Sequence, residues 1–191
     1  NYYKGRIKMK EIIEETEALM KKVEKNLLEE FSKIRLGKAN PIILEEIKVL
    51  YFGQKLPLNQ VASINVINPQ TIAIEPWDKN IIRDVERAIN EANLGLNPQI
   101  EGTIIKIFFP PLSEERRQEL IKFIRKLTEE RRVSIRNIRR DAIEKIKKSE
   151  KEKTLSEDES HRLQDEIQKL TDKFNEAIDR HEKAKEKDIL G

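Results

Sequence analysis

The sequence contains no cysteine, which excludes a disulfide scaffold, a thiol nucleophile and any metal site built on cysteine ligands. Aromatic residues make up only 5% of the 191 residues and hydrophobic residues 37%, so a single thick core is not expected. No apolar run approaches the roughly 18 residues of a membrane span, and no signal-peptide core is visible. We therefore expect a protein of the reducing cytoplasm with no membrane partner.

Charged residues are abundant instead, at 38% of the chain against about 25% in an average globular protein. Lysine and arginine number 38 and aspartate and glutamate 35, so the formal net charge is only +3. The charges are unevenly distributed. Residues 113–148 carry 13 basic and 7 acidic side chains, a net charge of +6, whereas residues 149–191 carry 9 and 13, a net charge of −4. One segment is therefore strongly basic, although the whole chain is not.

Three segments show the periodicity of amphipathic helices: residues 10–35, residues 113–148, and a segment that follows Ser156. Ser156 and Glu159 match a capping box. Each segment carries one apolar stripe and is polar elsewhere, so the three helices need one another as partners and predict a bundle. In the first helix the expected stripe is Ile12, Leu19, Val23, Leu27 and Ile34, with Thr16 and Glu30 in the remaining turns. Residues 1–8 do not continue this pattern, and we expect them to be an extension that precedes the helix.

Residues 39–112 change character, with short alternating runs typical of strands and a short helix expected over residues 78–92. The sequence therefore predicts an α+β fold. Residues 1–38 and 113–191 form an elongated three-helix bundle, and residues 39–112 form a small inserted β/α/β sandwich domain. The alternative is a single domain in which one long helix packs on a sheet.

The two crossings between bundle and insertion, residues 36–41 and 110–113, are rich in glycine and proline. They lack bulky packing residues, so we predict that they act as hinges. The predicted hinge residues are Gly37, Pro41, Pro110 and Pro111.

Patterns that indicate catalysis are scarce. The two histidines, His161 and His181, lie on the last helix, and His181 falls on its apolar stripe, where a half-buried histidine is commoner than a metal ligand. No phosphate-binding loop, dinucleotide-binding glycine motif, H-E-x-x-H zinc motif or nucleophile elbow occurs. We predict no catalysis, no metal and no cofactor.

The second long helix gathers its arginines on one side. At about 100° per residue, six of them follow one another around one side of the helix, and the acidic residues lie mostly on another, although Glu114 and Glu129 interrupt the basic side. We call this set the arginine face; it consists of Arg117, Arg125, Arg132, Arg136, Arg139 and Arg140. A guanidinium suits phosphate because it donates a planar fork of hydrogen bonds and stays charged.

A solvated face closed by ion pairs within the helix is the alternative interpretation of this pattern. The choice of arginine over lysine and the sorting of charge by face favour a polyanion ligand. No helix-turn-helix or basic-zipper arrangement is present, so RNA is a better candidate than duplex DNA. Phosphate contacts of this kind give position rather than base specificity.

Five segments resemble, in the right order, the signature segments of bacterial ribosome recycling factors. They are Arg35–Pro41, Leu94–Pro98, Pro111–Arg117, Arg136–Asp141 and Glu166–Asp172. The resemblance runs from about Met9 to Ile189. It implies a three-helix bundle with a hinged insertion. It also implies a function, which is to split the post-termination ribosome into subunits together with elongation factor G and GTP hydrolysis.

By this resemblance the bundle binds the large ribosomal subunit through its RNA, the inserted domain meets elongation factor G, and we expect a monomer. Where the family commonly has arginine, this sequence has Lys38, which keeps the charge but loses the fork and is a weaker candidate. The predicted RNA-binding residues are Arg35, Lys38, Arg117, Arg132, Arg136, Arg139 and Arg140. A coiled-coil protein that binds another helix through residues 156–189 is the competing interpretation.

Overall fold

The computed structural model describes residues 2–191, and the chain forms two compact units. The bundle unit consists of Asn1–Ile34 and Glu114–Gly191, and the inserted unit consists of Arg35–Ser113. The inserted unit therefore interrupts the bundle once, between the first and second of its long helices. This division differs from the alternative of one long helix packed on a sheet.

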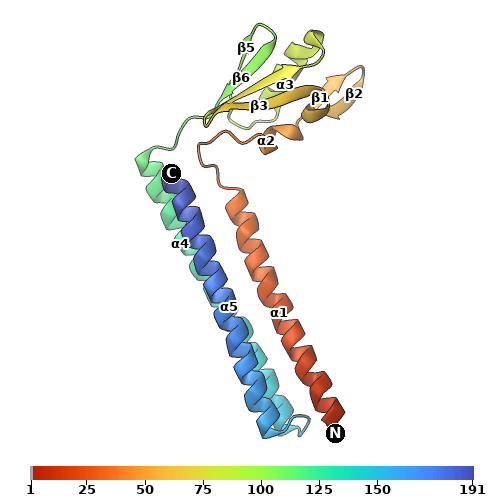
Figure 1. The fold of residues 1–191 in the computed structure, drawn as a ribbon, viewed down its shortest axis with the longest axis vertical. Coiled ribbons are helices and arrows are strands. Elements are labelled where there is room, and N and C mark those ends of the chain that lie inside the picture. Colours follow the sequence, from red (N-terminus) through yellow and green to blue (C-terminus); the bar gives the residue numbers. More distant parts are fainter. Residues whose placement is uncertain (1) are drawn as a thin grey trace. The chain divides into compact units, whose positions relative to one another are not determined.

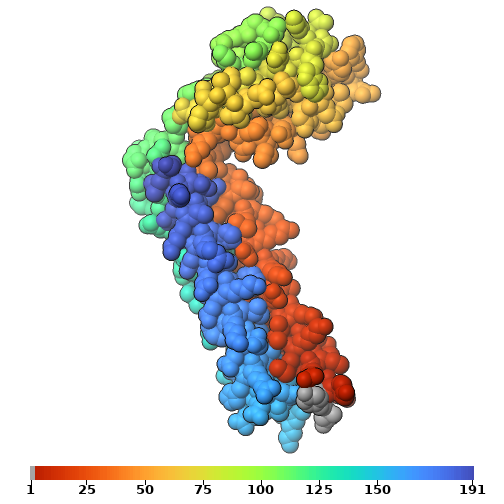
Figure 2. All heavy atoms as spheres, in the orientation of Figure 1, coloured from red at the N-terminus to blue at the C-terminus, as the bar shows by residue number. Residues whose placement is uncertain are grey.

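In the bundle unit, α1 (Tyr2–Ser32), α4 (Glu114–Lys151) and α5 (Glu157–Leu190) lie side by side, with α4 antiparallel to the other two (Figure 1). Side chains fill the space between α1 and α5 along the bundle (Figure 2). The predicted capping box is confirmed: the Ser156 hydroxyl accepts from the Glu159 amide at 3.2 Å, and the Ser156 amide donates to the Glu159 carboxylate at 2.9 Å.

The prediction that residues 1–8 lie outside the helix is wrong for residues 2–8, because α1 begins at Tyr2; residue 1 lies outside the described chain. Gly5 explains the error. It is buried against the start of α5, and a Cβ at this position would lie 2.7 Å from a carboxylate oxygen of Glu159. Glycine has no apolar side chain, so a packing position that it occupies does not appear in the hydrophobic periodicity of the sequence.

The stripe of α1 is also displaced from the expected one. Leu19 is 45% exposed and Val23 is half-buried. Besides Gly5, the buried residues follow steps of four and seven instead, and they are Ile12, Thr16, Met20, Leu27 and Phe31. Thr16 is compatible with this stripe because its hydroxyl donates to the Ile12 carbonyl at 2.7 Å, which leaves no buried donor unpaired.

The inserted unit is built on a four-stranded antiparallel sheet in the order β3-β4-β6-β5. Its strands are β3 (Ala62–Asn68), β4 (Thr71–Pro76), β6 (Ile104–Phe108) and β5 (Pro98–Glu101). The helix α3 (Ile82–Glu91) and the hairpin of β1 (Lys48–Tyr51) and β2 (Gln54–Pro57) complete the core. The short helix α2 (Ile42–Glu45) and two 3-10 turns, η1 (Leu58–Gln60) and η2 (Lys79–Ile81), connect these elements.

The short helix expected over residues 78–92 is present as η2 and α3, and the residues Ile81, Val85, Ala88 and Ile89 of this segment are all buried. The strand β5, however, has no counterpart in the sequence prediction. It is an edge strand that begins at Pro98 and has only half-buried and exposed residues. Proline is tolerated at the start of an edge strand because its missing amide is not needed there, so the local sequence resembles a loop.

Candidate nucleic-acid interface

The helix α4 places the arginine face. It begins with Glu114 and Glu115 and ends near Lys148 and Lys151, a charge order that suits the helix dipole. Its buried stripe packs against α1 and α5 and consists of Leu120, Ile121, Ile124, Thr128, Ile135, Ala142, Ile146 and Ser149. Because this stripe fixes the rotation of the helix, it also fixes which arginines face α5 and which face solvent.

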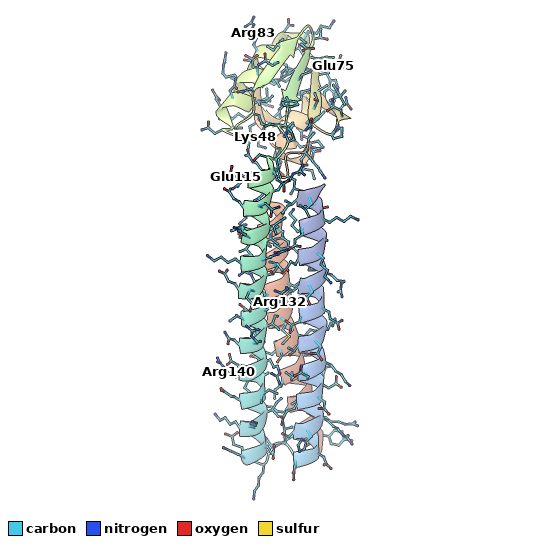
Figure 3. The ribbon with its side chains drawn as sticks, turned by 90° about the vertical axis from the view of Figure 1, so that its left-hand side faces the viewer. Lys48, Glu75, Arg83, Glu115, Arg132 and Arg140 are labelled. Atoms are coloured by element: carbon cyan, nitrogen blue, oxygen red, sulfur yellow. The ribbon has the colours of Figure 1, made fainter. Side chains whose placement is uncertain are left out.

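Two arginines of the face are bound by carboxylates of α5. Arg125 Nε lies 2.7 Å from a Glu186 oxygen, and Arg132 Nη2 lies 2.7 Å from Asp179 and 3.0 Å from Glu182. Figure 3 shows Arg132 between the two helices. A step of seven residues along α4 matches a step of seven back along α5, from Glu186 to Asp179.

Arg132 is the more enclosed of these two, with 25% of its side chain exposed. The buried Thr128 hydroxyl donates to the same Glu182 carboxylate. Burial lowers the pKa of Arg132, but the hydrogen bonds that it donates to Asp179 and the charge of Glu182 outweigh this effect and raise it overall. The hydrogen bond to Glu186 likewise raises the pKa of Arg125. Both guanidinium groups are thus firmly charged and already paired.

Arg117 is also engaged within the bundle. Its Nη1 donates to the Leu190 carbonyl at 3.1 Å, and its buried Nε has no hydrogen-bond partner among residues 2–191. The side chain is half-buried and ties the start of α4 to the end of α5. Of the predicted RNA-binding residues, Arg117 and Arg132 are therefore the two whose side chains are bound within the bundle.

The arginines further along α4 remain accessible. Arg136 is 58% exposed and contacts Glu129 at 3.1 Å, and Arg140 is 66% exposed with Asp141 at 3.7 Å. Arg139 is exposed, and within the described chain no ion pair or hydrogen bond involves it. In Figure 3 Arg140 lies on the outer side of α4, away from α5. These three residues form a strip of positive charge, which we call the free strip.

Asp172 is the α5 residue that the same step of seven places opposite Arg139. Its carboxylate accepts a hydrogen bond from Gln168 Nε2 at 2.8 Å, one turn earlier on α5. No ion pair joins Asp172 to Arg139 among the described residues, so the regular alternation of paired arginine and acid between the two helices stops here.

Arg35 and Lys38 belong to the inserted unit. Arg35 is exposed, and its Nη1 donates to the Leu94 carbonyl, which joins the first crossing to the loop before β5. Its other donors are free of such contacts in residues 2–191. Lys38 is exposed and makes no ion pair within the described chain.

The two crossings contact each other at Gly37. Its φ of +67° is one that side chains disfavour, and a Cβ there would lie 2.8 Å from the Leu112 amide nitrogen and 2.9 Å from the Pro110 carbonyl oxygen. Further in, the Ala39 amide donates to the Pro69 carbonyl at 2.8 Å, and the Phe109 amide donates to the Gln70 carbonyl at 2.7 Å. Both crossings are thus anchored on the β3–β4 turn.

The two histidines are not arranged as ligands of a metal site. His181 Nε2 lies 2.8 Å from Glu24 and links α5 to α1, while the exposed His161 lies 4.0 Å from Glu157. Within residues 2–191 no group of three or more histidine or acidic side chains could hold a metal ion, and no helix is long and apolar enough to cross a membrane.

A family model described as ribosome recycling factor matches residues 27–190. The chain belongs to the ribosome recycling factor family. A ribosome-recycling factor of Symbiobacterium thermophilum is 50% identical over 181 residues, which cover 95% of this chain and 98% of the relative. One from Thermus thermophilus is 44% identical over 183 residues, covering 96% and 99%.

Solved structures of the family agree with this assignment. A solution structure of a ribosome recycling factor matches with a TM-score of 0.72 and 42% identity over 95% of this chain and 97% of that one. A second match describes models of the T. thermophilus factor and E. coli elongation factor G bound to the E. coli post-termination complex. It has a TM-score of 0.58 and 44% identity, over 96% and 99% of the two chains. The predicted α+β fold, a helical bundle with an inserted β/α/β domain, is confirmed.

Sequence reasoning missed the acidic residues of α5 that divide the arginine face of this family member. Asp179, Glu182 and Glu186 lay in a segment known only to be acidic, and no pairing was assigned to them. A signal was present: Arg125 and Arg132 are seven residues apart, as are Asp179 and Glu186. Two antiparallel helices with matched seven-residue steps bring such residues together about every second turn.

Proposed function

We propose that this chain splits post-termination ribosomal complexes into subunits, acting with elongation factor G and GTP hydrolysis. Membership of the ribosome recycling factor family supports this function, as does the relative whose structure is described with elongation factor G on a post-termination complex. The sequence offers no phosphate-binding loop of its own. The energy of the reaction would therefore come from the GTPase, and the chain would act as a non-catalytic factor.

We further propose that the bundle binds RNA of the large ribosomal subunit through the free strip. The observation that carries this proposal is the exposure of Arg136, Arg139 and Arg140 on one rigid helix, where α5 provides no ion-pair partner for them. Arg35 and Lys38 are exposed cations that would add phosphate contacts from the inserted unit. Arg117 and Arg132 would support the strip without touching RNA.

Binding through phosphates releases counterions, so the affinity should fall steeply with salt. The test is to measure binding of Arg139→Ala to purified large subunits across a salt series. Loss of one phosphate contact should weaken binding at every salt concentration and reduce the slope of log K against log salt by about 1. Arg87→Ala is the matched control, since it removes an exposed arginine of the inserted unit. Equal affinity and slope for Arg139→Ala and wild type would contradict this proposal.

The crossings are proposed as the hinge on which the inserted unit turns when the partner GTPase acts. The hydrogen bonds of Ala39 and Phe109 to the β3–β4 turn confine the proposed pivot to residues 35–38 and 110–113. Pro41 lies inside this anchor, where its carbonyl accepts from the Leu44 amide at 3.0 Å. Among the predicted hinge residues, Gly37, Pro110 and Pro111 therefore keep this role, and Pro41 instead opens α2.

The chain has no cysteine, so one engineered cysteine in each crossing gives a single cross-link. If the crossings act as a hinge, complete cross-linking should abolish subunit splitting with elongation factor G and GTP, while binding to the large subunit persists. Light scattering follows the splitting, and reduction of the bond should restore it. Splitting at the wild-type rate after full cross-linking would refute the hinge.

A further inference from the structure

Glu129 is one of the two acidic residues that interrupt the arginine face, and its two carboxylate oxygens contact different arginines. Oε2 lies 3.5 Å from Arg132 Nη1, and Oε1 lies 3.1 Å from Arg136 Nη2. Arg132 is already fixed by Asp179 and Glu182 of α5. Glu129 therefore lies at the boundary between the paired part of the face and the free strip.

The contact with Arg136 is unusual for a helix surface. Ion pairs along a helix ordinarily join residues three or four apart, whereas Glu129 and Arg136 are seven apart, about 10 Å along the axis. Both side chains must extend toward each other along the helix to meet. The carboxylate thus holds an exposed guanidinium in one direction, and it offers the negative oxygen that a phosphate would offer.

We propose that Glu129 is a positioning residue that occupies, in the free protein, the place of an RNA phosphate on Arg136. This inference rests on the proposed RNA binding of the free strip. A phosphate displaces the carboxylate when RNA binds, and the carboxylate takes Arg136 back when the protein leaves. Glu129 therefore weakens the complex and speeds its dissociation, which suits a factor that must leave the ribosome after each round.

Glu129→Gln tests this role, with Glu130→Gln as the matched control. The two changes remove the same charge from adjacent positions, and the two side chains are similarly exposed, at 56% and 51%. Glu130 contacts Arg131 at 3.9 Å and no member of the free strip. Glu129→Gln should bind large subunits about two- to fivefold more tightly, the range of an exposed ion pair. The gain should appear as slower dissociation, and Glu130→Gln should change binding by less than half as much.

The decisive comparison repeats both substitutions in an Arg136→Gln background. If Glu129 acts through Arg136, its substitution should bring no further gain there. An equal gain for Glu129→Gln and Glu130→Gln, or a gain that persists in the Arg136→Gln background, would overturn the inference and leave the proposed function intact. An Arg136→Gln variant that binds as tightly as wild type would instead refute the place of Arg136 in the RNA-binding strip, and Glu129 would lose its role with it.

Discussion

Arg132 provides the sharpest test of the division of the arginine face, because the structure assigns it to bundle stability although the sequence assigned it to RNA. The change is Arg132→Met, which keeps the apolar stem and removes the charge. It takes a cation from Asp179, which is 51% exposed, and from Glu182, which is 19% exposed. Glu129, the third carboxylate near Arg132, keeps its contact with Arg136. The Glu182 carboxylate would then keep only the hydrogen bond from the Thr128 hydroxyl.

The expected cost follows from these two exposures. The pair with the exposed Asp179 is worth about 0.2–1 kcal/mol. Leaving the enclosed Glu182 carboxylate without its cation costs about 1–3 kcal/mol. We therefore expect Arg132→Met to lower the free energy of unfolding by about 2 kcal/mol, which corresponds to a fall in Tm of about 4–8 °C for a chain of this size.

The assay is thermal and urea unfolding followed by circular dichroism at 222 nm, which reports mainly the three long helices. Arg140→Met is the control, and we expect it to change stability by less than about 0.5 kcal/mol, because its partner Asp141 is exposed and 3.7 Å away. Binding should show the reverse order: Arg140→Met weakens attachment to large subunits, and Arg132→Met leaves it unchanged. A stable Arg132→Met variant that binds weakly would refute the reasoning, because the α5 pairs would then open to RNA.

Three further predictions concern other parts of the chain. Gly37→Ala forces a Cβ to 2.8 Å from the facing backbone at φ +67°, and we expect it to destabilise the inserted unit by about 1–3 kcal/mol in hydrogen exchange. The hydrogen bond and charge of Lys33 lower the pKa of Glu30 below 4.5, so this pair stabilises the fold above pH 4.5 and the gain is lost as the pH falls through the lower folded value. Lys33→Met should remove that small acid-dependent increment from pH-dependent unfolding curves. Gln168→Ala frees the carboxylate that it binds, opposite Arg139, and should weaken large-subunit binding about two- to fivefold; unchanged binding would contradict this role.

The sequence predicted the bundle because long helices that each carry one apolar stripe can bury these stripes in few ways other than by packing together. It failed where packing depends on something other than apolar side chains. Gly5 makes its contact because it lacks a side chain, so it contributes nothing to hydrophobic periodicity. Thr16, which was expected in the stripe of the first helix, is buried because its hydroxyl is satisfied within the helix. The strand β5 depends on pairing with β6 rather than on its own alternation.

About as much of the candidate site as of the fold could be predicted from the sequence. Helical geometry placed the arginines on one side of α4, and the structure keeps them there. The sequence of a single helix could not show which residues of the neighbouring helix lie opposite its arginines. The register of α5 decides whether Arg125 and Arg132 face acidic side chains or solvent. That register depends on core packing along both helices, which is a property of the pair rather than of either segment.

The free strip therefore depends on α5 as much as on α4. Arg125, Arg132 and Arg139 follow one another at steps of seven residues, so they occupy equivalent positions on α4. Two of these arginines are nevertheless paired with carboxylates within the described chain, and the third is not. The first two are bound by Glu186, and by Asp179 with Glu182, whereas no α5 carboxylate pairs with the third among the described residues. Charge on a helix surface thus becomes available to a ligand only where the neighbouring helix leaves it unpaired. Substitutions on α5 that never touch RNA should for this reason change RNA binding, in the direction set by the carboxylate they add, remove or release.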